Sequence, residues 1–167
     1  MTPRRAAPEV ALRPAAAADA DVIAALFLAT RRQAMPYLPE LHTETETHAW
    51  IAGHVLPQTA VTVGEVDGRI VGFSSVHDGV LEHLYVLPAR HGFGIGGTLL
   101  DAAKAAHPGG LRLFVFQQNA LARRFYENRG FRLVELTDGA GNEERLPDAL
   151  YAWPARGATA AECPARE

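Results

Sequence analysis

The stretch Leu84-Tyr-Val-Leu-Pro-Ala-Arg-His-Gly-Phe-Gly-Ile-Gly-Gly-Thr-Leu-Leu100 decides the fold of this 167-residue chain. It predicts a buried strand that ends at Leu87, then a glycine-rich turn, then an apolar helix that begins near Gly94. Glycines let a backbone approach a ligand closely, and the first turn of a helix carries unpaired N–H groups and the positive end of the helix dipole. The segment therefore predicts an anion site of the kind that binds a phosphate-bearing cofactor.

The same glycines also satisfy a dinucleotide-binding fingerprint, as Gly92-x-Gly94-x-x-Gly97. That fold needs an acidic residue about 20 positions later, at the end of the next strand, to hold the ribose. Here the region reads Phe116-Gln-Gln-Asn119 and contains no carboxylate. The fingerprint also lies in the middle of the chain, after two expected hairpins. Both observations exclude a dinucleotide site.

The composition is that of one ordinary globular domain, with 48% hydrophobic and 21% charged residues. A formal net charge of −3 gives no general attraction to nucleic acid or to an anionic membrane, so we expect neither as a partner. No apolar run approaches a membrane span, and the single Cys163 forms no intrachain disulfide, so we expect a cytoplasmic protein. We expect one domain at residues 9–154 between flexible ends at residues 1–8 and 155–167.

Hydrophobic periodicity and turn signals predict the order β-α-α-β-β-β-α-β-α-β-β. The expected strands cover residues 10–13, 60–66, 70–76, 80–87, 111–116, 131–136 and 149–153. The expected helices cover residues 19–35, a segment that begins at Thr43, and residues 94–106 and 119–128. A capping box at Thr43 and Glu46 opens the second helix, which we expect to carry Trp50 inward. The fold class is therefore α/β (α+β), with a mixed, mostly antiparallel sheet of about six or seven strands flanked by about four helices.

Two motifs in this order resemble the GCN5-related N-acetyltransferase (GNAT) superfamily, over residues 10–153. The strand-turn-helix segment resembles that family's acyl-CoA pyrophosphate loop, R/Q-x-x-G-x-G/A, as His91-Gly-Phe-Gly94-Ile-Gly96. About 28 residues later, Asn119-x-x-Ala122-Arg-Arg-Phe-Tyr126-x-x-x-Gly130-Phe131 resembles the second CoA motif, N-x-x-A-x-x-F-Y-x-x-x-G-F. The segment that follows is similar to a subgroup of small bacterial acetyltransferases. One departure is that His91 stands where the family has Arg or Gln, with Arg90 one place upstream.

The resemblance implies a site for acetyl-CoA or coenzyme A. Backbone N–H groups from Gly92 to Thr98 are expected around the pyrophosphate, with the Thr98 hydroxyl adding a hydrogen bond. Asn119, Ala122, Arg123 and Tyr126 lie on one helix face, and the resemblance makes that face line the pantetheine arm, with Arg123 free to reach a phosphate. The expected cofactor contacts are Tyr85, Val86, Arg90, His91, Gly92, Phe93, Gly94, Ile95, Gly96, Gly97, Thr98, Asn119, Ala122, Arg123 and Tyr126.

For catalysis, the resemblance places Tyr126 near the cofactor sulfur, where it serves as general acid toward the departing thiolate. The alternative is that Tyr126 only fills the core. Glu82 is the best candidate base, because a carboxylate in an apolar strand is costly unless it is exposed or used. The alternative for Glu82 is a solvent-facing strand residue. In a regular strand His83 points to the opposite face, and only a bulge changes that. The resemblance also makes the Val86 N–H polarise the thioester carbonyl.

The acceptor side is less defined. By resemblance, Tyr37, His42 and Trp50 belong to the acceptor wall, although core packing explains Trp50 equally well, and His83 is a further candidate. The acidic residues Glu44, Glu46, Glu143, Glu144 and Asp148 either attract a cationic amine or form solvated faces. The histidines lack the spacing and the third ligand of a metal site, so no metal is expected.

Together these features predict an N-acetyltransferase that moves an acetyl group to a primary amine of a small molecule or peptide. No cysteine is placed to carry an acyl-enzyme, so direct transfer in a ternary complex is expected. The alternative function is a non-catalytic acyl-CoA sensor, which needs neither Glu82 nor Tyr126. The sequence is compatible with a monomer or a homodimer.

Overall fold

The computed structural model describes residues 8–154. Apart from Pro8, the ends expected to be flexible lie outside this range, as does Cys163. The strands are β1 (Ala11–Pro14), β2 (Ala60–Val66), β3 (Arg69–His77), β4 (Val80–Val86), β5 (Leu111–Phe116), β6 (Arg132–Leu136) and β7 (Asp148–Trp153). The α-helices are α1 (Ala20–Ala34), α2 (Glu44–Trp50), α3 (Leu56–Gln58), α4 (Ile95–Ala106) and α5 (Ala120–Glu127). Short 3-10 turns η1 (Ala17–Asp19) and η3 (Pro88–Arg90) and a π-helical turn η2 (Ile51–Val55) complete the set.

The strands form one seven-stranded sheet in the order β1-β2-β3-β4-β5-β7-β6. Every neighbouring pair is antiparallel except β4 and β5, which are parallel. The predicted fold class is confirmed, and β5 is central as its apolar content indicated. Within the described residues, no helix has the length and apolar character needed to cross a membrane.

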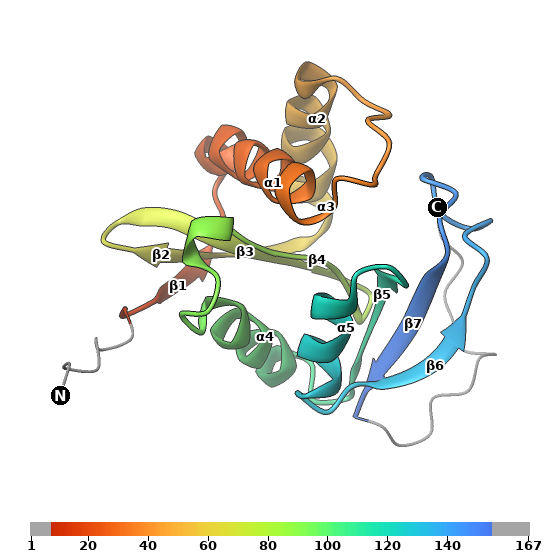
Figure 1. Ribbon diagram of the computed structural model, residues 1–167. Helices are drawn as coiled ribbons and strands as arrows, with labels where there is room; N and C mark the ends of the chain where they lie inside the picture. The colour runs from red at the N-terminus through yellow and green to blue at the C-terminus, as the bar shows by residue number, and fades with distance from the viewer. Residues whose placement is uncertain (1–7, 155–167) are drawn as a thin grey trace, which may run out of the picture.

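Helices cover both faces of the sheet. Figure 1 shows α1, α2 and α3 on one side and α4 and α5 on the other. On the first side Ile23, Ile51 and Phe73 are fully buried between the helices and the sheet. On the second side, Leu99 of α4 packs on Val86 of β4, so the strand before the glycine turn is fixed by the helix that follows it.

The second predicted helix is longer and less regular than expected. The helices α2 and α3 are joined without a break by the π-helical turn η2. Pro57 follows that turn, and a proline lacks the N–H of a regular helical bond and crowds the carbonyl four residues before it, which a wider turn relieves. The prediction that Trp50 points inward was wrong. Its side chain is 38% exposed, whereas Ile51 and Val55 are fully buried.

The sheet contains a seam between β4 and β5. Only one residue pair, Val80 with Arg112, links these two strands, and the Arg112 amide donates to the Gly79 carbonyl at 2.9 Å. Figure 1 shows β1–β4 and β5–β7 as two groups of strands that run in different directions. The carboxyl ends of β4 and β5 therefore separate, and main-chain groups on the facing edges of both strands are left for another partner.

Candidate active site

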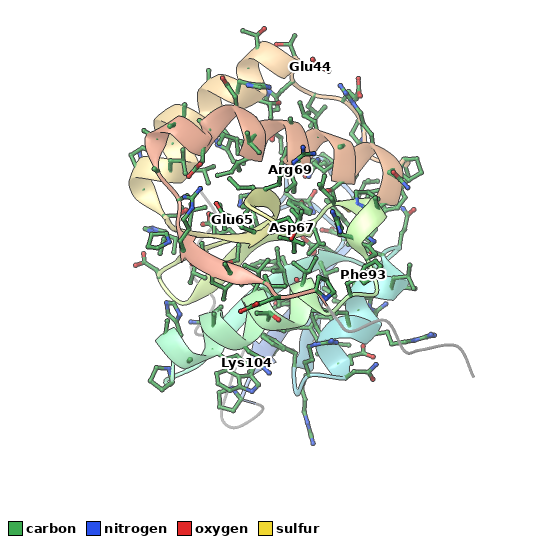
Figure 2. The ribbon with its side chains drawn as sticks, turned by 90° about the vertical axis from the view of Figure 1, so that its left-hand side faces the viewer. Glu44, Glu65, Asp67, Arg69, Phe93 and Lys104 are labelled. Atoms are coloured by element: carbon green, nitrogen blue, oxygen red, sulfur yellow. The ribbon has the colours of Figure 1, made fainter. Side chains whose placement is uncertain are left out.

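The glycine turn is built as an anion cradle. Gly92 and Gly94 have φ angles of +83° and +80°, which L side chains rarely adopt, and Gly94 is the N-cap of α4. Among the described residues, no protein group accepts from the amides of residues 92–94, and residues 95–97 form the unbonded first turn of α4. In Figure 2 the labelled Phe93 lies at one end of this helix, and its side chain is 42% exposed. Six consecutive amides are therefore available to a phosphate.

Thr98 does not extend the cradle with its amide, contrary to the expected range. Its N–H donates to the Gly94 carbonyl at 3.0 Å, as the fourth residue of a helix normally does. Its hydroxyl donates to the same carbonyl, also at 3.0 Å. An anion has to compete with that carbonyl for the hydroxyl hydrogen.

His91 faces away from the cradle. Its Nε2 lies 2.8 Å from the Val86 carbonyl oxygen, and because a carbonyl only accepts, the ring N–H is the donor. This bond ties the turn back to the end of β4. Arg90, in contrast, has no side-chain partner within residues 8–154. Of the two residues between which the sequence left the choice open, Arg90 is the one with a free side chain.

The helix α5 begins as its motif predicts, but two of its polar side chains are engaged. Asn119 is the N-cap, and its side-chain oxygen accepts from the Ala122 amide at 3.2 Å. Its side-chain NH2 remains for a ligand. Arg123 donates from Nε to the Tyr151 hydroxyl at 3.0 Å and from Nη1 to the Gln117 carbonyl at 3.4 Å. The expectation that Arg123 is free to reach a phosphate was therefore wrong.

A second arginine, which the sequence analysis missed, lies beside the cradle. The guanidinium of Arg129 stacks on the Phe125 ring, with Cζ 3.9 Å from the ring centroid. On its other side is Gly97, where a β-carbon would lie 3.3 Å from Arg129 Nη2. Gly97 therefore leaves room for a cation next to the first turn of α4. No periodicity reveals this position, because Arg129 follows the last turn of α5.

Tyr126 is buried on α5, with 9% of its surface exposed, and its ring meets Phe131 edge-on at 5.5 Å. Burial, with a contribution from nearby Tyr85, raises the pKa of Tyr126 above its usual value of 10.0, so the phenol keeps its proton at neutral pH. Among the described side chains, only the Tyr37 hydroxyl is both sealed from solvent and without a partner. The Tyr126 hydroxyl is thus an accessible donor with no protein acceptor.

The main chain of Val86 faces the seam. The Leu87 amide donates to the Val71 carbonyl at 2.8 Å, so in this antiparallel pair residues 85 and 87 bond to β3 and residue 86 points the other way. The N–H of Val86 is therefore directed into the gap between β4 and β5. Tyr85 bonds to β3 through its main chain and packs its ring on Phe27 at 5.4 Å. Of these two expected cofactor contacts, only Val86 faces the gap.

A bulge in β4 brings Glu82 and His83 to the same cavity. Ser75 pairs with His83 and Val76 with Leu81, so Glu82 is an extra residue without a partner on β3. In a regular strand the two side chains point to opposite faces. Here both line one open cavity of about 1330 Å³.

Ser75 fixes the protonation pattern of His83. The fully buried Ser75 hydroxyl lies 2.7 Å from His83 Nδ1, and it has no other acceptor within the described residues. We assign its hydrogen to Nδ1, which leaves the ring hydrogen on Nε2. Burial, aided by the charge of Arg31, lowers the pKa of His83 from 6.5 to about 4, so the ring stays neutral at physiological pH. His83 therefore offers the cavity an N–H donor rather than a basic lone pair.

Glu82 is the better placed proton acceptor. Desolvation raises the pKa of its carboxyl above the ordinary value of 4.5, against the opposing effect of His77 and His54. Its side chain is nonetheless exposed at the cavity. A carboxylate with a raised pKa is a stronger base than an ordinary one.

Most of the residues expected on the acceptor side line this cavity. His42, Trp50, Glu82 and His83 line it, together with side chains from α1, β5 and the segment between β6 and β7. Trp50 contacts the His83 ring edge-on at 5.5 Å. Tyr37 packs on Phe116, which lines the cavity, with ring centroids 6.4 Å apart.

The acidic residues divide into two groups. Glu144 forms an ion pair with Arg31 of α1 at 2.8 Å, with side chains 14% and 21% exposed, and Glu44 forms a more exposed pair with Arg32 at 2.9 Å. Asp148 accepts from the Thr137 hydroxyl at 2.5 Å and is buried. These three carboxylates stabilise the fold. Glu46 and Glu143 both approach His42 at the cavity rim, where the side chains remain exposed.

Comparison with known proteins shows which proteins this chain is similar to. Residues 57–133 match the family described as acetyltransferase (GNAT) domain. The chain is similar to peptidyl-lysine N-acetyltransferase YiaC of Escherichia coli (strain K12), with 36% identity over 93 residues. That match covers 55% of this chain and 62% of YiaC, so the chain spans about three fifths of the length of this relative.

Solved structures share the fold at lower identity. The apo form of YjaB from Escherichia coli superimposes with a TM-score of 0.74 at 21% identity, covering 90% of this chain and 99% of that one. PaiA N-acetyltransferase from Thermoplasma acidophilum, solved in complex with coenzyme A, has a TM-score of 0.67 at 20% identity and covers 86% and 98% of the two chains. The seven-stranded arrangement and its seam are thus a known fold.

Proposed function

We propose that this chain, whose residues 57–133 match the acetyltransferase (GNAT) domain family, transfers an acetyl group from acetyl-CoA to a primary amine of a small molecule or peptide. One observation carries the proposal. The chain has a row of free amides at the start of α4 and a Val86 N–H directed into the seam, and Glu82 lines a cavity formed partly by both strands of that seam. The Tyr126 hydroxyl on α5 has no protein partner among the described residues. Each group supplies a different requirement of acyl transfer.

The residues present fit coenzyme A. Its pyrophosphate needs several convergent donors, and the six amides of residues 92–97 have no protein acceptor within the described chain. Its pantetheine arm carries amides, which suit the free edges of β4 and β5 and the unused side-chain NH2 of Asn119. PaiA, which shares the fold, was solved with coenzyme A, and this supports the same occupant here.

The mechanism follows from what each residue can donate or accept. Bound acetyl-CoA supplies the activated acetyl carbonyl. Glu82 takes a proton from the protonated amine, directly or through a water, so that the nitrogen has a lone pair for attack. The Val86 N–H donates to the carbonyl oxygen and stabilises the negative charge that develops there. Tyr126 would give its proton to the sulfur as the carbon–sulfur bond breaks, and the second proton lost by the attacking nitrogen would return to the phenol through solvent.

Transfer is direct. The described residues contain no cysteine that could carry an acyl-enzyme, which supports transfer in a ternary complex. The large, open cavity accepts a flexible amine, and the resemblance to a peptidyl-lysine N-acetyltransferase supports a lysine side chain as one acceptor class.

The test combines a release assay with a binding assay. Release of free thiol from acetyl-CoA is measured across a panel of amino acids, polyamines, aminoglycosides and lysine peptides, and mass spectrometry identifies each product. We expect release with at least one amine and a product heavier by one acetyl group. A raised melting temperature with acetyl-CoA but no release on the whole panel would favour the alternative, a non-catalytic acyl-CoA sensor.

A further inference from the structure

The guanidinium of Arg129 has neighbours that hold it in place but few hydrogen-bond acceptors. Nη1 donates to the Phe125 carbonyl at 3.2 Å, while Nε and Nη2 have no acceptor within residues 8–154. The group stacks on the Phe125 ring and lies next to Gly97, and these contacts restrict its position. A guanidinium restricted in this way, with two free donors, is suited to a planar or tetrahedral anion.

The charge of Arg129 is also unbalanced. It forms no ion pair with any described carboxylate. Lys104 lies close enough for Arg129 to lower its pKa, although burial is the larger cause, and the Lys104 ammonium donates to the Arg129 carbonyl at 2.5 Å. Figure 2 shows Lys104 on α4, well away from the end that carries Phe93. Lys104 on α4 and Arg129 beside it are thus two neighbouring cations, and Asp101 is a nearby carboxylate.

The other basic side chains near the cradle are less suited to the same task. The ring N–H of His91 donates to the Val86 carbonyl, and Arg123 is hydrogen-bonded to Tyr151 and Gln117. Arg90 is free but sits on the 3-10 turn before the cradle, on the β4 side. Arg129 approaches from the α5 side, beside the third residue of α4.

We propose that Arg129 binds a phosphate group of coenzyme A, with Gly97 and Phe125 holding the guanidinium in position. This inference rests on the proposed function, because it needs coenzyme A in the cradle. Two phosphate sources fit the same chemistry, namely the pyrophosphate and the 3′-phosphate of the adenosine. Arg129 supplies a cation from the α5 side of the cradle, in addition to Arg90 on the β4 side, in a loop where His91 replaces Arg or Gln.

The experiment compares two ligands and several variants by isothermal titration calorimetry. Wild type, Arg129→Gln, Arg129→Lys and the control Arg124→Gln are each titrated with coenzyme A and with 3′-dephospho-coenzyme A. Arg124 is an exposed arginine on α5, the helix that precedes Arg129, so its removal changes net charge equally. Circular dichroism and thermal unfolding without ligand report on the fold. If Arg129→Gln does not fold, Arg129→Met is used in its place, because methionine keeps an aliphatic side chain on Phe125.

We expect Arg129→Gln to weaken coenzyme A binding roughly tenfold, as for loss of a charge-assisted hydrogen bond, with Arg129→Lys intermediate and Arg124→Gln within about twofold of wild type. If the 3′-phosphate is the partner, the affinity ratio of the two ligands falls toward one in Arg129→Gln. If the pyrophosphate is the partner, both ligands weaken equally. A folded Arg129→Gln protein with wild-type affinity would overturn this inference alone, whereas failure of wild type to bind either ligand would overturn the proposed function as well.

Discussion

At the scale of single residues, one bulge gives neighbouring side chains different roles. Because Glu82 has no partner on β3, it and His83 both face the cavity, and Ser75 then makes His83 a donor. The sequence Leu-Glu-His alternates as a regular strand does, so no pattern in it signals the extra residue. Glu82 and Tyr126 were identifiable from residue type and motif. Their position relative to His83 depends on how β4 pairs with β3, and the sequence around these residues does not reveal that pairing.

Tyr126→Phe tests the general acid. Removing the hydroxyl should lower kcat by roughly 10²-fold, because the leaving thiolate loses its proton donor. Acetyl-CoA affinity should stay within about twofold of wild type, and stability within about 0.5 kcal/mol, because no described protein group bonds to this hydroxyl. Steady-state kinetics and calorimetry provide the two measurements. Unaltered kcat would remove Tyr126 from the mechanism.

Glu82→Gln tests the base through its pH dependence. The base acts when ionised, so activity rises with pH through its pKa, which desolvation places above the ordinary value of 4.5. Without the carboxylate, the amine must lose its proton to solvent, and the kcat/KM profile should move to higher pH. A raised pKa in the folded state means that ionisation opposes folding, so the variant should be no less stable than wild type at pH 7. An unchanged pH profile would contradict the assignment.

At the scale of elements, the sequence predicts best where local signals agree. Glycines, an N-cap asparagine and apolar periodicity placed α4 and α5 within a residue of their observed bounds. The π-helical turn before Pro57 was missed, because a continuous helix and a widened one share the same apolar spacing. Trp50 follows the helical pattern of a core residue and is instead a cavity wall.

Gly94→Ala tests the turn as an element, with Gly53→Ala as its matched control. A left-handed φ of +80° costs a non-glycine residue about 1–2 kcal/mol, so Gly94→Ala should lower the free energy of unfolding by that amount and weaken acetyl-CoA binding. Gly53 has no positive φ and no atom within 4 Å of an added β-carbon, so alanine there should be neutral or stabilising by up to about 1 kcal/mol. Urea unfolding measures both. Equal stability of the two variants would mean that the turn tolerates a side chain.

At the scale of the whole molecule, the site exists only because distant segments meet. The cofactor half lies within one stretch of sequence and was largely predictable from its motifs. The acceptor half combines α1, the bulge in β4 and the segment between β6 and β7, and the first and last of these are more than 100 positions apart. No local pattern couples Arg31 to Glu144, so this half could be proposed only by resemblance.

Glu144→Gln tests the ion pair that joins α1 to the segment between β6 and β7, and Glu143→Gln is its neighbour control. Loss of the Glu144 charge leaves the partly buried Arg31 guanidinium without a counter-charge, which should cost about 1–3 kcal/mol of unfolding free energy. Glu143 faces His42 with both side chains more than half exposed, so its substitution should change stability by less than about 0.5 kcal/mol. Chemical denaturation at pH 7 separates the two. Equal effects would show that the ion pair adds no stability.

The seam between β4 and β5 has a consequence for how this protein changes over evolutionary time. The groups that face it at Val86 and in the cradle belong to the main chain, and no point substitution removes a peptide N–H unless it introduces proline. Substitutions of side chains around the proposed cofactor site therefore leave these main-chain donors in place. The presence of His91 at a loop position where arginine or glutamine is usual is one example. Because such substitutions are tolerated, related proteins can change the residues that line the acceptor cavity and still use acetyl-CoA as the acetyl donor.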